Sequence, residues 1–246
     1  MAPVPRRRPS TTTAELLRRV PYFRSLPLAE LRRLASQCAP RALRPGEVLF
    51  AEGRPCHGLF VVVEGTVEVR QTSLRGREQV FHTEGPGATV GEGPLFDRGG
   101  YIATAIATEA ARVLFLRRAD LLDLCRRRPA VALSMLETLA RRMRHFAELV
   151  SDLAFRPVPE RLARYLSGLA GAAAPGATLD LELSQAQLAA RLGTVRELVA
   201  RAFSLLEDRG ILSRKRARVI IRDPAKLAAL ARGEATAVLS PKGDVT

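Results

Sequence analysis

The spacing of apolar and polar positions changes along the chain, and each change indicates a different kind of structure. Between residues 14 and 38, Leu28, Leu31, Leu34 and Ala35 stand at helical spacing and predict short helices. From Leu43 to Leu116 the apolar runs are brief, rich in β-branched residues and separated by glycine turns. Short strands at regular spacing predict an antiparallel roll or barrel. The expected strands lie within residues 41–50, 57–70, 77–84, 88–92, 101–108 and 111–118.

The segment from about Pro129 to Phe155 carries the strongest helical pattern of the chain. Apolar residues recur there at the a and d positions of a heptad over about three repeats. Such a helix can pack on its own roll or on a second copy, and the strict seven-residue repeat favours self-pairing. We therefore expect a parallel two-stranded coiled-coil dimer. The predicted dimerisation residues are Leu136, Leu139, Met143, Phe146, Val150 and Leu153.

Pro157 and Pro159 predict that the long helix stops or kinks, so that a new unit begins. The small residues of 171–180 predict a loop. Beyond it stand two S/T-x-x-E/Q patterns, Ser184 with Gln187 and Thr194 with Glu197, each typical of a capping box at a helix start. Two helices broken at Gly193 are the helix-turn-helix arrangement, whose second helix enters the major groove by its N-terminal end.

The second helix is expected to present its first turns to DNA and to pack its other face on a core. The core side is predicted to contain Leu198, Val199, Ala202, Phe203, Leu205 and Leu206. Arg196 can donate a bidentate pair to guanine, and Glu197 can accept from cytosine. Arg201 can touch a base or orient Glu197, and an ordinary surface salt bridge between these two residues is the alternative.

The stretch ILSRKRARVIIRDP predicts two strands around a basic turn, a wing whose cations hold phosphates. Ser184 and Gln185, at the start of the first helix, are further candidates for DNA contact. The full set of predicted DNA-binding residues is Ser184, Gln185, Thr194, Val195, Arg196, Glu197, Arg201, Arg214, Lys215 and Arg216.

Composition and charge support a nucleic-acid partner. The chain of 246 residues is 47% hydrophobic, enough for real cores, and its formal net charge is +14. A basic excess of this size indicates a polyanionic partner, because each neutralised phosphate releases counterions. The N-terminal residues lack the apolar stretch of a secretory signal, and no apolar run is long enough to span a bilayer. A cytoplasmic location without membrane contact is expected.

Cysteine and histidine usage argues against metal chemistry. Cys38, Cys56 and Cys125 are widely spaced and form no C-x-x-C pair, so that neither a disulfide framework nor a zinc or iron–sulfur site is predicted. The three histidines, His57, His82 and His145, also lack ligand spacing. No metal site and no catalytic residue are expected.

The stretch GEGPLFDRGGYIATA, residues 91–105, is rich in glycine. Glycine-rich turns let backbone N–H groups close on a phosphate, so this turn is a candidate effector site. Together with the motifs RPGEVLFAEG (44–53), GLFVVVEGTVEVR (58–70) and QAQLAARLGTVRELVARAFSLLEDRGIL (185–212), its first part resembles the Crp/Fnr family of bacterial transcription regulators.

That resemblance implies an α+β chain with an N-terminal antiparallel β-roll of the cyclic-nucleotide-binding kind, a long dimerisation helix and a C-terminal winged helix-turn-helix domain. The expected boundaries are 1–14 for a disordered N-terminus, 15–128 for the sensor, 129–156 for the helix, 157–231 for the DNA-binding domain and 232–246 for a flexible tail. The implied partners are double-stranded DNA, a second copy of the chain and RNA polymerase.

The resemblance also bears on the two candidate sites. Arg196, Glu197, Val199 and Arg201 match the family's recognition-helix core, whereas Leu198 and Ala200 replace the usual Thr and Ser or Gly. The operator is therefore not to be copied from a relative.

In cyclic-nucleotide-binding relatives a glycine turn and a Glu bind the nucleotide, and Gly91 and Glu92 match them. The Arg–Ser/Thr pair that neutralises the phosphate is replaced by Ile102 and Ala103, followed by Thr104. A phosphate buried against an isoleucine has no charge partner, and classical cyclic AMP binding is not expected.

Arg98, near the tip of the turn, is the one cation that could rescue a nucleotide. The candidate effector residues are thus Gly91, Glu92, Arg98, Ala103 and Thr104. The effector itself is unknown, with a nucleotide or a haem on His82 or His57 left open. Two other functions compete: a metal-dependent cupin-type enzyme, which needs converging histidines, and a cyclic-nucleotide module without DNA binding, which the capped helix pair and wing oppose.

Overall fold

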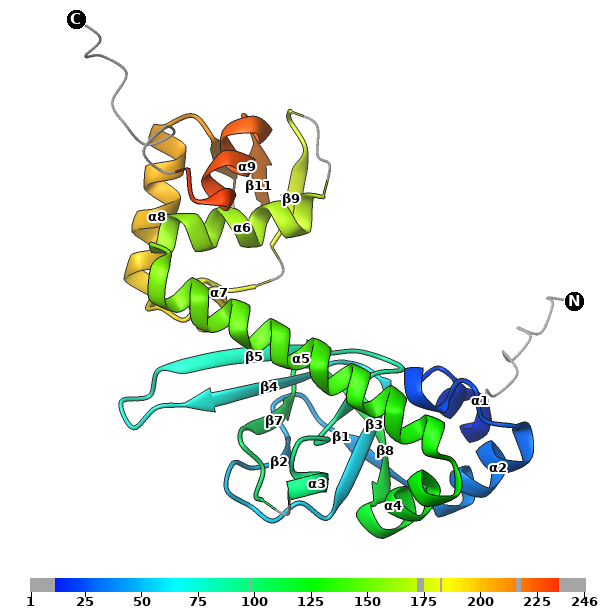
Figure 1. Ribbon diagram of the computed structural model, residues 1–246. Coiled ribbons are helices and arrows are strands. Elements are labelled where there is room, and N and C mark those ends of the chain that lie inside the picture. Colours follow the sequence, from blue (N-terminus) through cyan, green and yellow to red (C-terminus); the bar gives the residue numbers. More distant parts are fainter. Residues whose placement is uncertain (1–11, 98, 172–174, 182, 216–217, 235–246) are drawn as a thin grey trace, which may run out of the picture. The chain divides into compact units, whose positions relative to one another are not determined.

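The structure is a computed structural model, and it describes residues 12–97, 99–171, 175–181, 183–215 and 218–234. The chain forms two compact units, residues 1–71 with 81–145 and residues 72–80 with 146–246 (Figure 1). In the described residues no helix is long and apolar enough to cross a membrane.

The first unit begins with short helices and continues as a β-roll. The helices are α1 (Thr13–Arg18), the 3₁₀ turn η1 (Pro21–Phe23) and α2 (Leu28–Gln37). The strands are β1 (Ala39–Leu43), β2 (Val48–Phe50), β3 (Gly58–Glu64), β4 (Val67–Thr72), β5 (Glu78–Glu84), β6 (Thr89–Val90), β7 (Thr104–Ala107) and β8 (Ala111–Arg117), with α3 (Pro94–Asp97) between β6 and β7. They form sheets ordered β1-β8-β3-β6 and β2-β7-β4-β5, and the pairings are antiparallel. The predicted antiparallel roll is confirmed.

Strand β3 holds the roll and its helices together. Successive side chains of a strand point to opposite faces, so a strand buried on both faces reads as a continuous apolar run. Leu59, Val61 and Val63 belong to the core formed with α1, α2 and the following helices. Phe60 and Val62, which alternate with them, belong to the core inside the roll. The uninterrupted run GLFVVV is thus explained by burial on both sides.

The N-terminal boundary differs from the one expected at residue 14. Thr12 caps α1 through a capping box with Glu15, and Ala14 is buried in the core, so the helix includes residues assigned to a disordered segment. Residues 1–11 lie outside the described part of the chain. A helix that the sequence reading did not anticipate, α4 (Arg118–Arg127), follows β8 directly and buries Leu121 and Leu124.

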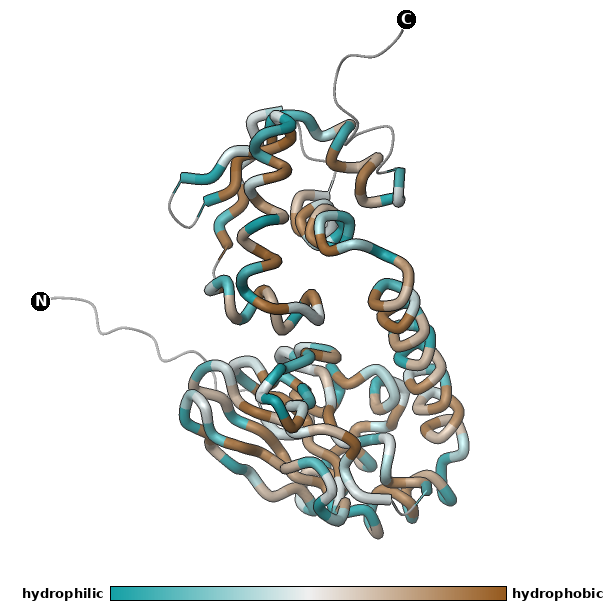
Figure 2. Tube along the Cα trace, turned by 90° about the vertical axis from the view of Figure 1, so that its left-hand side faces the viewer, coloured by the Kyte–Doolittle hydropathy of each residue, from teal (hydrophilic) through white to brown (hydrophobic). Residues whose placement is uncertain are grey.

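Helix α5 (Pro129–Phe155) has the bounds that its heptad pattern predicted. Val131 and Met135 are buried in the core of the first unit. By contrast, the a positions Leu136, Met143 and Val150 are 60%, 70% and 65% exposed. Figure 2 shows hydrophobic and hydrophilic bands along its coil. The a positions of its seam are therefore apolar side chains that the single chain leaves in water, whereas Leu139 and Phe146 at d positions are half-buried.

The second unit is a helical domain with a small sheet. Its elements after α5 are α6 (Val158–Ala170), β9 (Thr178–Asp180), α7 (Gln185–Leu192), α8 (Arg196–Asp208), β10 (Leu212–Lys215), β11 (Arg218–Ile221) and α9 (Pro224–Arg232). The sheet has the order β10-β11-β9. As the proline pair predicted, the long helix stops at Phe155 and a new one begins at Val158.

The loop expected over 171–180 is wrong at its end. Thr178, Leu179 and Asp180 form β9 and pair with β11 in antiparallel register. The reason is tertiary: the outer edge of β11 offers unpaired backbone groups, and a short extended segment satisfies them whatever its side chains. Residues 172–174 of this stretch, and the tail from residue 235, lie outside the described residues.

Candidate DNA-binding and effector sites

In the helix-turn-helix, α7 begins with a side-chain cap and α8 begins without one. Ser184 and Gln187 form the capping box of α7, as predicted. Gly193 ends α7 in the left-handed conformation at φ 62°, a conformation that glycine adopts without strain. The second predicted box, Thr194 with Glu197, is wrong. The N-cap of α8 is Val195, in extended conformation and without a side-chain cap, so Thr194 stands one residue too early to act as one.

Helix α8 separates a buried face from an exposed one. Val199, Ala202, Phe203 and Leu206 are buried in the domain core, at the i, i+3, i+4 and i+7 positions of one stripe. Leu198 was expected on this face but is 39% exposed, because it precedes the stripe by one residue, or about 100° of helix. It lies on the exposed side.

The predicted base-reading residues occupy the exposed first turns of α8. Arg196, Glu197 and Arg201 are exposed, whereas Thr194 and Val195 are half-buried. Arg196 Nε donates to Gln185 Oε1 at 3.5 Å, which places the start of α7 beside the start of α8. Among the described side chains, Glu197 and Arg201 form no ion pair with each other. The surface salt bridge considered as their alternative role is thus absent there.

A residue that the sequence reading missed holds the turn between the two helices. Arg161 of α6 donates through Nη1 to the carbonyl of Leu192 and, at 3.4 Å, to that of Gly193. These are C-terminal carbonyls of α7, which attract a cation. Burial lowers the pKa of Arg161, with Asp152 opposing the effect. No local pattern around Arg161 indicated this role, because its partners lie about 30 residues away.

The predicted wing is present as the hairpin of β10 and β11, with Lys215 paired to Arg218 in register. Arg214, however, is already engaged. Its Nη2 lies 2.7 Å from Glu207 Oε2, and its guanidinium lies 4.7 Å from the centroid of the Phe203 ring. The hydrogen bond from Arg214 lowers the pKa of Glu207. Lys215 is exposed, and Arg216 lies outside the described residues.

The corner between α5 and α6 is held by one carboxylate. Asp152 Oδ1 lies 3.0 Å from Arg156 Nε, one turn later, and 2.8 Å from Arg164 Nη1 on α6. Arg156 also donates to the carbonyl of Ala231, in α9, at 3.1 Å. Asp152, before the two prolines, is thus paired with Arg164, after them, and this ion pair joins α5 to α6.

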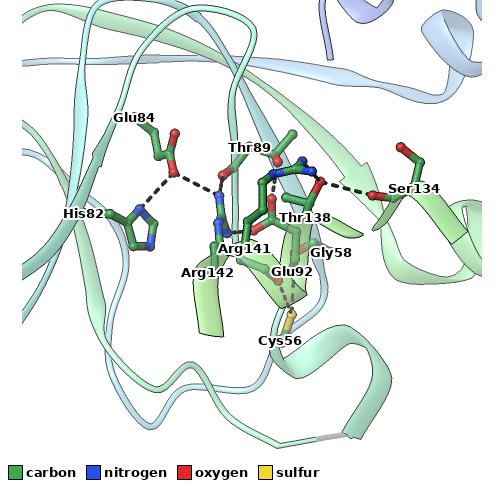
Figure 3. A network of polar contacts seen from close by, with 11 residues as sticks. Cys56, Gly58, His82, Glu84, Thr89, Glu92, Ser134, Thr138, Arg141 and Arg142 are labelled. Atoms are coloured by element: carbon green, nitrogen blue, oxygen red, sulfur yellow. Dashed lines mark hydrogen bonds and ion pairs between the residues drawn. The ribbon is translucent and has the colours of Figure 1, made fainter. Parts of the chain in front are cut away.

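In the first unit, Glu92 is the centre of a buried polar cluster (Figure 3). Its carboxylate, 1% exposed, accepts hydrogen bonds from the Thr89 hydroxyl and from Arg142 Nη1. Arg142 Nη2 further donates to Glu84 Oε1 at 3.0 Å and to the Thr89 carbonyl at 2.6 Å. Burial disfavours the charge of Arg142, but Glu92 and Glu84 outweigh it, so the pKa of Arg142 is raised. We call Glu84, Thr89, Glu92 and Arg142 the Glu92 cluster.

Arg142 was not singled out from the sequence, although a signal existed. It stands seven residues after Met135 and eleven after Val131, so it lies on the α5 face that packs on the roll. A basic residue on a buried face needs a buried carboxylate, and Glu92 is that carboxylate. Glu92 lies 50 residues earlier in the chain, next to Gly91 in the glycine-rich turn.

Of the other predicted effector residues, Ala103 immediately precedes β7 and Thr104 begins it. Ala103 is buried, and Thr104 Oγ1 accepts the backbone N–H of Glu52 at 3.1 Å. Ile102, which stands where the resemblance implies an Arg, has a side chain that is 64% exposed and supplies no cation. Arg98 lies outside the described residues.

The two candidate haem ligands, His82 and His57, have different surroundings. His82 Nδ1 is 3.0 Å from Glu84 Oε1, an electrostatic contact without hydrogen-bond geometry, and so His82 faces the Glu92 cluster. His57 is exposed and lines a separate cavity. The described residues contain no group of three or more His, Cys, Asp or Glu that could hold a metal ion.

Known protein families match both the β-roll and the helix-turn-helix domain. Residues 40–128 match the family model "Cyclic nucleotide-binding domain", and residues 160–230 match "Crp-like helix-turn-helix domain". The chain is 31% identical over 222 residues to the CRP-like cAMP-activated global transcriptional regulator of Mycobacterium tuberculosis, covering 89% of this chain and 99% of that protein.

Two further comparisons, both with proteins of Thermus thermophilus, give a similar result. The chain is 34% identical over 214 residues to the cyclic AMP receptor protein, covering 87% of this chain and 97% of that one. The crystal structure of the catabolite activator protein aligns with a TM-score of 0.51 at 32% identity, covering 87% and 99%. The chain therefore belongs to the Crp/Fnr family, whose members are transcription regulators and not enzymes.

Proposed function

We propose that this protein is a homodimeric, sequence-specific DNA-binding regulator that reads a pseudo-palindromic site with α8 and does not use cyclic AMP in the classical way. The observation that carries the DNA-reading role is the exposure of Arg196, Glu197 and Arg201 on the first turns of a helix anchored by its opposite face. Arg196 would pair with a guanine and Glu197 with a cytosine.

The contacts to phosphate are assigned to the residues around that helix. Lys215 is exposed at the end of β10, and Ser184 and Gln185 stand at the N-terminus of α7, where the helix dipole favours an anion. Arg214 has the smaller role, because contact with DNA would compete with its bonds to Glu207. The net charge of +14 adds a sequence-independent attraction to the duplex.

The second partner is another copy of the chain. The exposed a positions of α5 form an apolar stripe at a seven-residue repeat, which two parallel helices bury against each other. A twofold axis along this seam would present two α8 helices to successive major grooves, about 34 to 36 Å apart. Residues 129–156 are thus proposed as the dimerisation helix, between a sensor over 15–128 and a DNA-binding domain over 157–231.

A cyclic phosphate does not fit the described residues of the roll. The charged members of the Glu92 cluster are two carboxylates, Glu84 and Glu92, and one guanidinium, Arg142, so the formal charges of these three groups sum to −1. An added anion would meet repulsion there, and Ile102 with Ala103 supplies no cation. Cyclic AMP is therefore not proposed as the effector, although the family relatives named above carry it in their names.

An effector would act by shifting the population of two arrangements of α5 and α6. Arg142 ties α5 to the roll, and Asp152 ties α5 to α6, so both contacts bias how the recognition helices are held. RNA polymerase is the third proposed partner, since control of transcription acts on it. The protein would act in the cytoplasm, on chromosomal DNA.

The test is selection of binding sites from random duplex DNA by the full-length protein, with its mass measured by light scattering at the same concentration. We expect a twofold motif with half-sites one helical turn apart, and the mass of a dimer. A lone protomer, or selected sites without twofold symmetry, would overturn the proposal. The Arg196→Ala variant serves as control, because it should lose the motif while keeping the dimer mass.

A further inference from the structure

The β-roll contains a cavity that the Glu92 cluster does not use. It has a volume of about 780 Å³, within the usual range for small-molecule sites. Its lining comes from β1, β2, β3, β8, the loop after β2 and Tyr101 before β7, and includes no member of the Glu92 cluster.

Its apolar wall is a row of aromatic rings. The rings of Phe50 and Tyr101 are stacked, with centroids 3.8 Å apart and an interplanar angle of 12°. Phe60 continues the row, 5.9 Å from Phe50 and 4.9 Å from Phe115. Such a surface favours a flat aromatic body, which stacks on or meets the ring edges.

The charged residues of the lining are basic. Arg41 donates to the carbonyls of Leu49 and Val48 and forms an ion pair with Glu47, which already balances its charge. Arg54 and His57 are exposed lining residues, and the structure gives neither side chain an ionic partner within the described part of the chain. The lining itself contains no Asp or Glu. A guanidinium beside an aromatic wall fits a carboxylate at one end of an aromatic molecule.

We propose that this cavity is a binding site for a small aromatic carboxylate, with the ring against Phe50, Phe60 and Tyr101 and the carboxylate on Arg54 and His57. The site is also placed to influence α5. A side chain on Gly91 would lie 3.2 Å from the Tyr101 ring and 3.6 Å from the Phe50 ring, so these rings pack on Gly91. The next residue, Glu92, holds Arg142 of α5. Occupancy of the cavity would thus bias the contact between roll and helix.

Binding is tested with 2-naphthoate, an aromatic carboxylate whose fluorescence is free of tryptophan overlap because the chain contains no Trp. We expect saturable binding to the full-length protein. Arg54→Ala should weaken it by about tenfold or more, the loss of one charge-assisted hydrogen bond. Arg75→Ala, an exposed arginine outside the lining, is the matched control and should leave it unchanged. The neutral analogue 2-naphthylmethanol should bind more weakly and should not respond to Arg54→Ala.

Two cavity-filling variants locate the site. Ala51 and Ala39 both line the cavity and neither is fully buried, so Ala51→Phe and Ala39→Phe, which add no Trp, should each abolish binding while circular dichroism stays unchanged. Two variants are used so that a folding defect in one leaves the test standing. Undiminished binding in both, or no saturable binding to the parent protein, would overturn the proposed site.

The link to α5 has a separate readout, which rests on the proposed function. With a selected DNA site, 2-naphthoate should shift the affinity of the parent protein and not that of a folded cavity-filling variant. Binding of 2-naphthoate without a shift would overturn the link and leave the site intact. Absence of DNA binding with or without 2-naphthoate would instead count against the proposed function, which the fluorescence titration does not depend on.

Discussion

Arg142 of α5 donates a hydrogen bond to the carboxylate of Glu92, and only 1% of the Glu92 side chain is accessible to solvent. The pair joins a turn of the roll to the long helix across 50 residues of sequence. A carboxylate so deeply buried is stable as an anion only while its cation stays in place. The contact therefore matters both for the stability of the first unit and for how α5 is held.

Removal of Arg142 should destabilise the protein severely. Arg142→Ala leaves Glu92 buried without its partner, and breaking such a pair costs about 3 to 5 kcal/mol in the free energy of unfolding. Arg141→Ala is the matched control. Arg141 is exposed and donates to Thr138, so its loss should cost about 0 to 1 kcal/mol. Urea denaturation measures both, and similar losses would contradict the role given to Arg142.

The same pair should show coupling in a double variant. Arg142→Met combined with Glu92→Gln removes both charges, and should be less destabilised than the sum of the single variants. If the double variant loses as much free energy of unfolding as the two single variants together, the two side chains act independently.

Arg196 and Lys215 should have different effects on DNA binding. Arg196→Ala is expected to cost about 1 to 3 kcal/mol on the selected site and little on random DNA, because Arg196 is proposed to read a base. Lys215→Ala should weaken binding to both kinds of DNA and reduce the salt slope by about 1, as a phosphate contact does. Fluorescence anisotropy across a salt series separates the two. Equal losses on specific and random DNA for Arg196→Ala would reduce Arg196 to a phosphate contact.

The dimer seam is tested by two neighbouring positions of α5. Val150→Glu places a carboxylate at an a position, where dimerisation would bury it unpaired, and the protein should become monomeric. Ser151→Glu adds the same charge one residue later, on an exposed position outside the seam, and should remain dimeric. Light scattering after size exclusion gives the mass. A dimer in the Val150→Glu variant would place the interface elsewhere.

Cyclic AMP should not bind to the parent protein with an affinity tighter than about 1 mM, because the described charges at the Glu92 cluster repel an anion. Ile102→Arg with Ala103→Ser installs the cation and hydroxyl that the sequence lacks, and should gain at least about tenfold in affinity. Ile102→Leu, with no new charge, is the control. Isothermal titration calorimetry measures all three, and micromolar binding by the parent protein would contradict the proposal.

Cys38 should be inert in the folded protein. Burial, together with the nearby Asp120, raises the pKa of its thiol from 9.0 to about 12. At pH 8 only about one thiol in ten thousand is then the reactive thiolate. A chain that carries Cys56→Ala and Cys125→Ala, and so keeps only Cys38, should react with a thiol reagent slowly until it is unfolded in urea. Equal rates in both states would contradict the shielding.

The same shift has a consequence for alkaline stability. Because the pKa of Cys38 is higher in the folded than in the unfolded state, the stabilisation is complete below about pH 9 and is lost as the pH rises toward about 12. The free energy of unfolding should fall over this window, and Cys38→Ala should remove part of the slope. Denaturation curves at pH 8, 9.5 and 11 measure it.

Local patterns predicted most of the elements. The bounds of α5 followed from its heptads, and the pairing of β10 with β11 followed from apolar runs around a basic turn. These signals are read within a few residues, because helix and strand periods are properties of neighbouring positions. The continuous apolar run from Leu59 to Val63 likewise predicted a strand, but which core covers each of its faces was decided by packing.

The errors have two causes, a local signal placed one residue off and a tertiary contact that no local pattern shows. Thr194 had the right residue type for a cap and stood one position too early, and Leu198 had the right hydrophobicity and stood one residue before the core stripe. The pairing of β9 with β11 depended on an edge supplied by residues about 40 positions later.

The contacts that tie the candidate sites together join residues far apart in the chain. Glu92 with Arg142, Arg161 with the end of α7, and Phe50 stacked on Tyr101 are such pairs. The sequence determines the chemical groups, their charges and the local hydrophobic periodicity, and from these the architecture and the family can be predicted. Which buried acid meets which base depends on how the elements pack, since the energy of a buried charge is set by the atoms around it and not by its sequence neighbours.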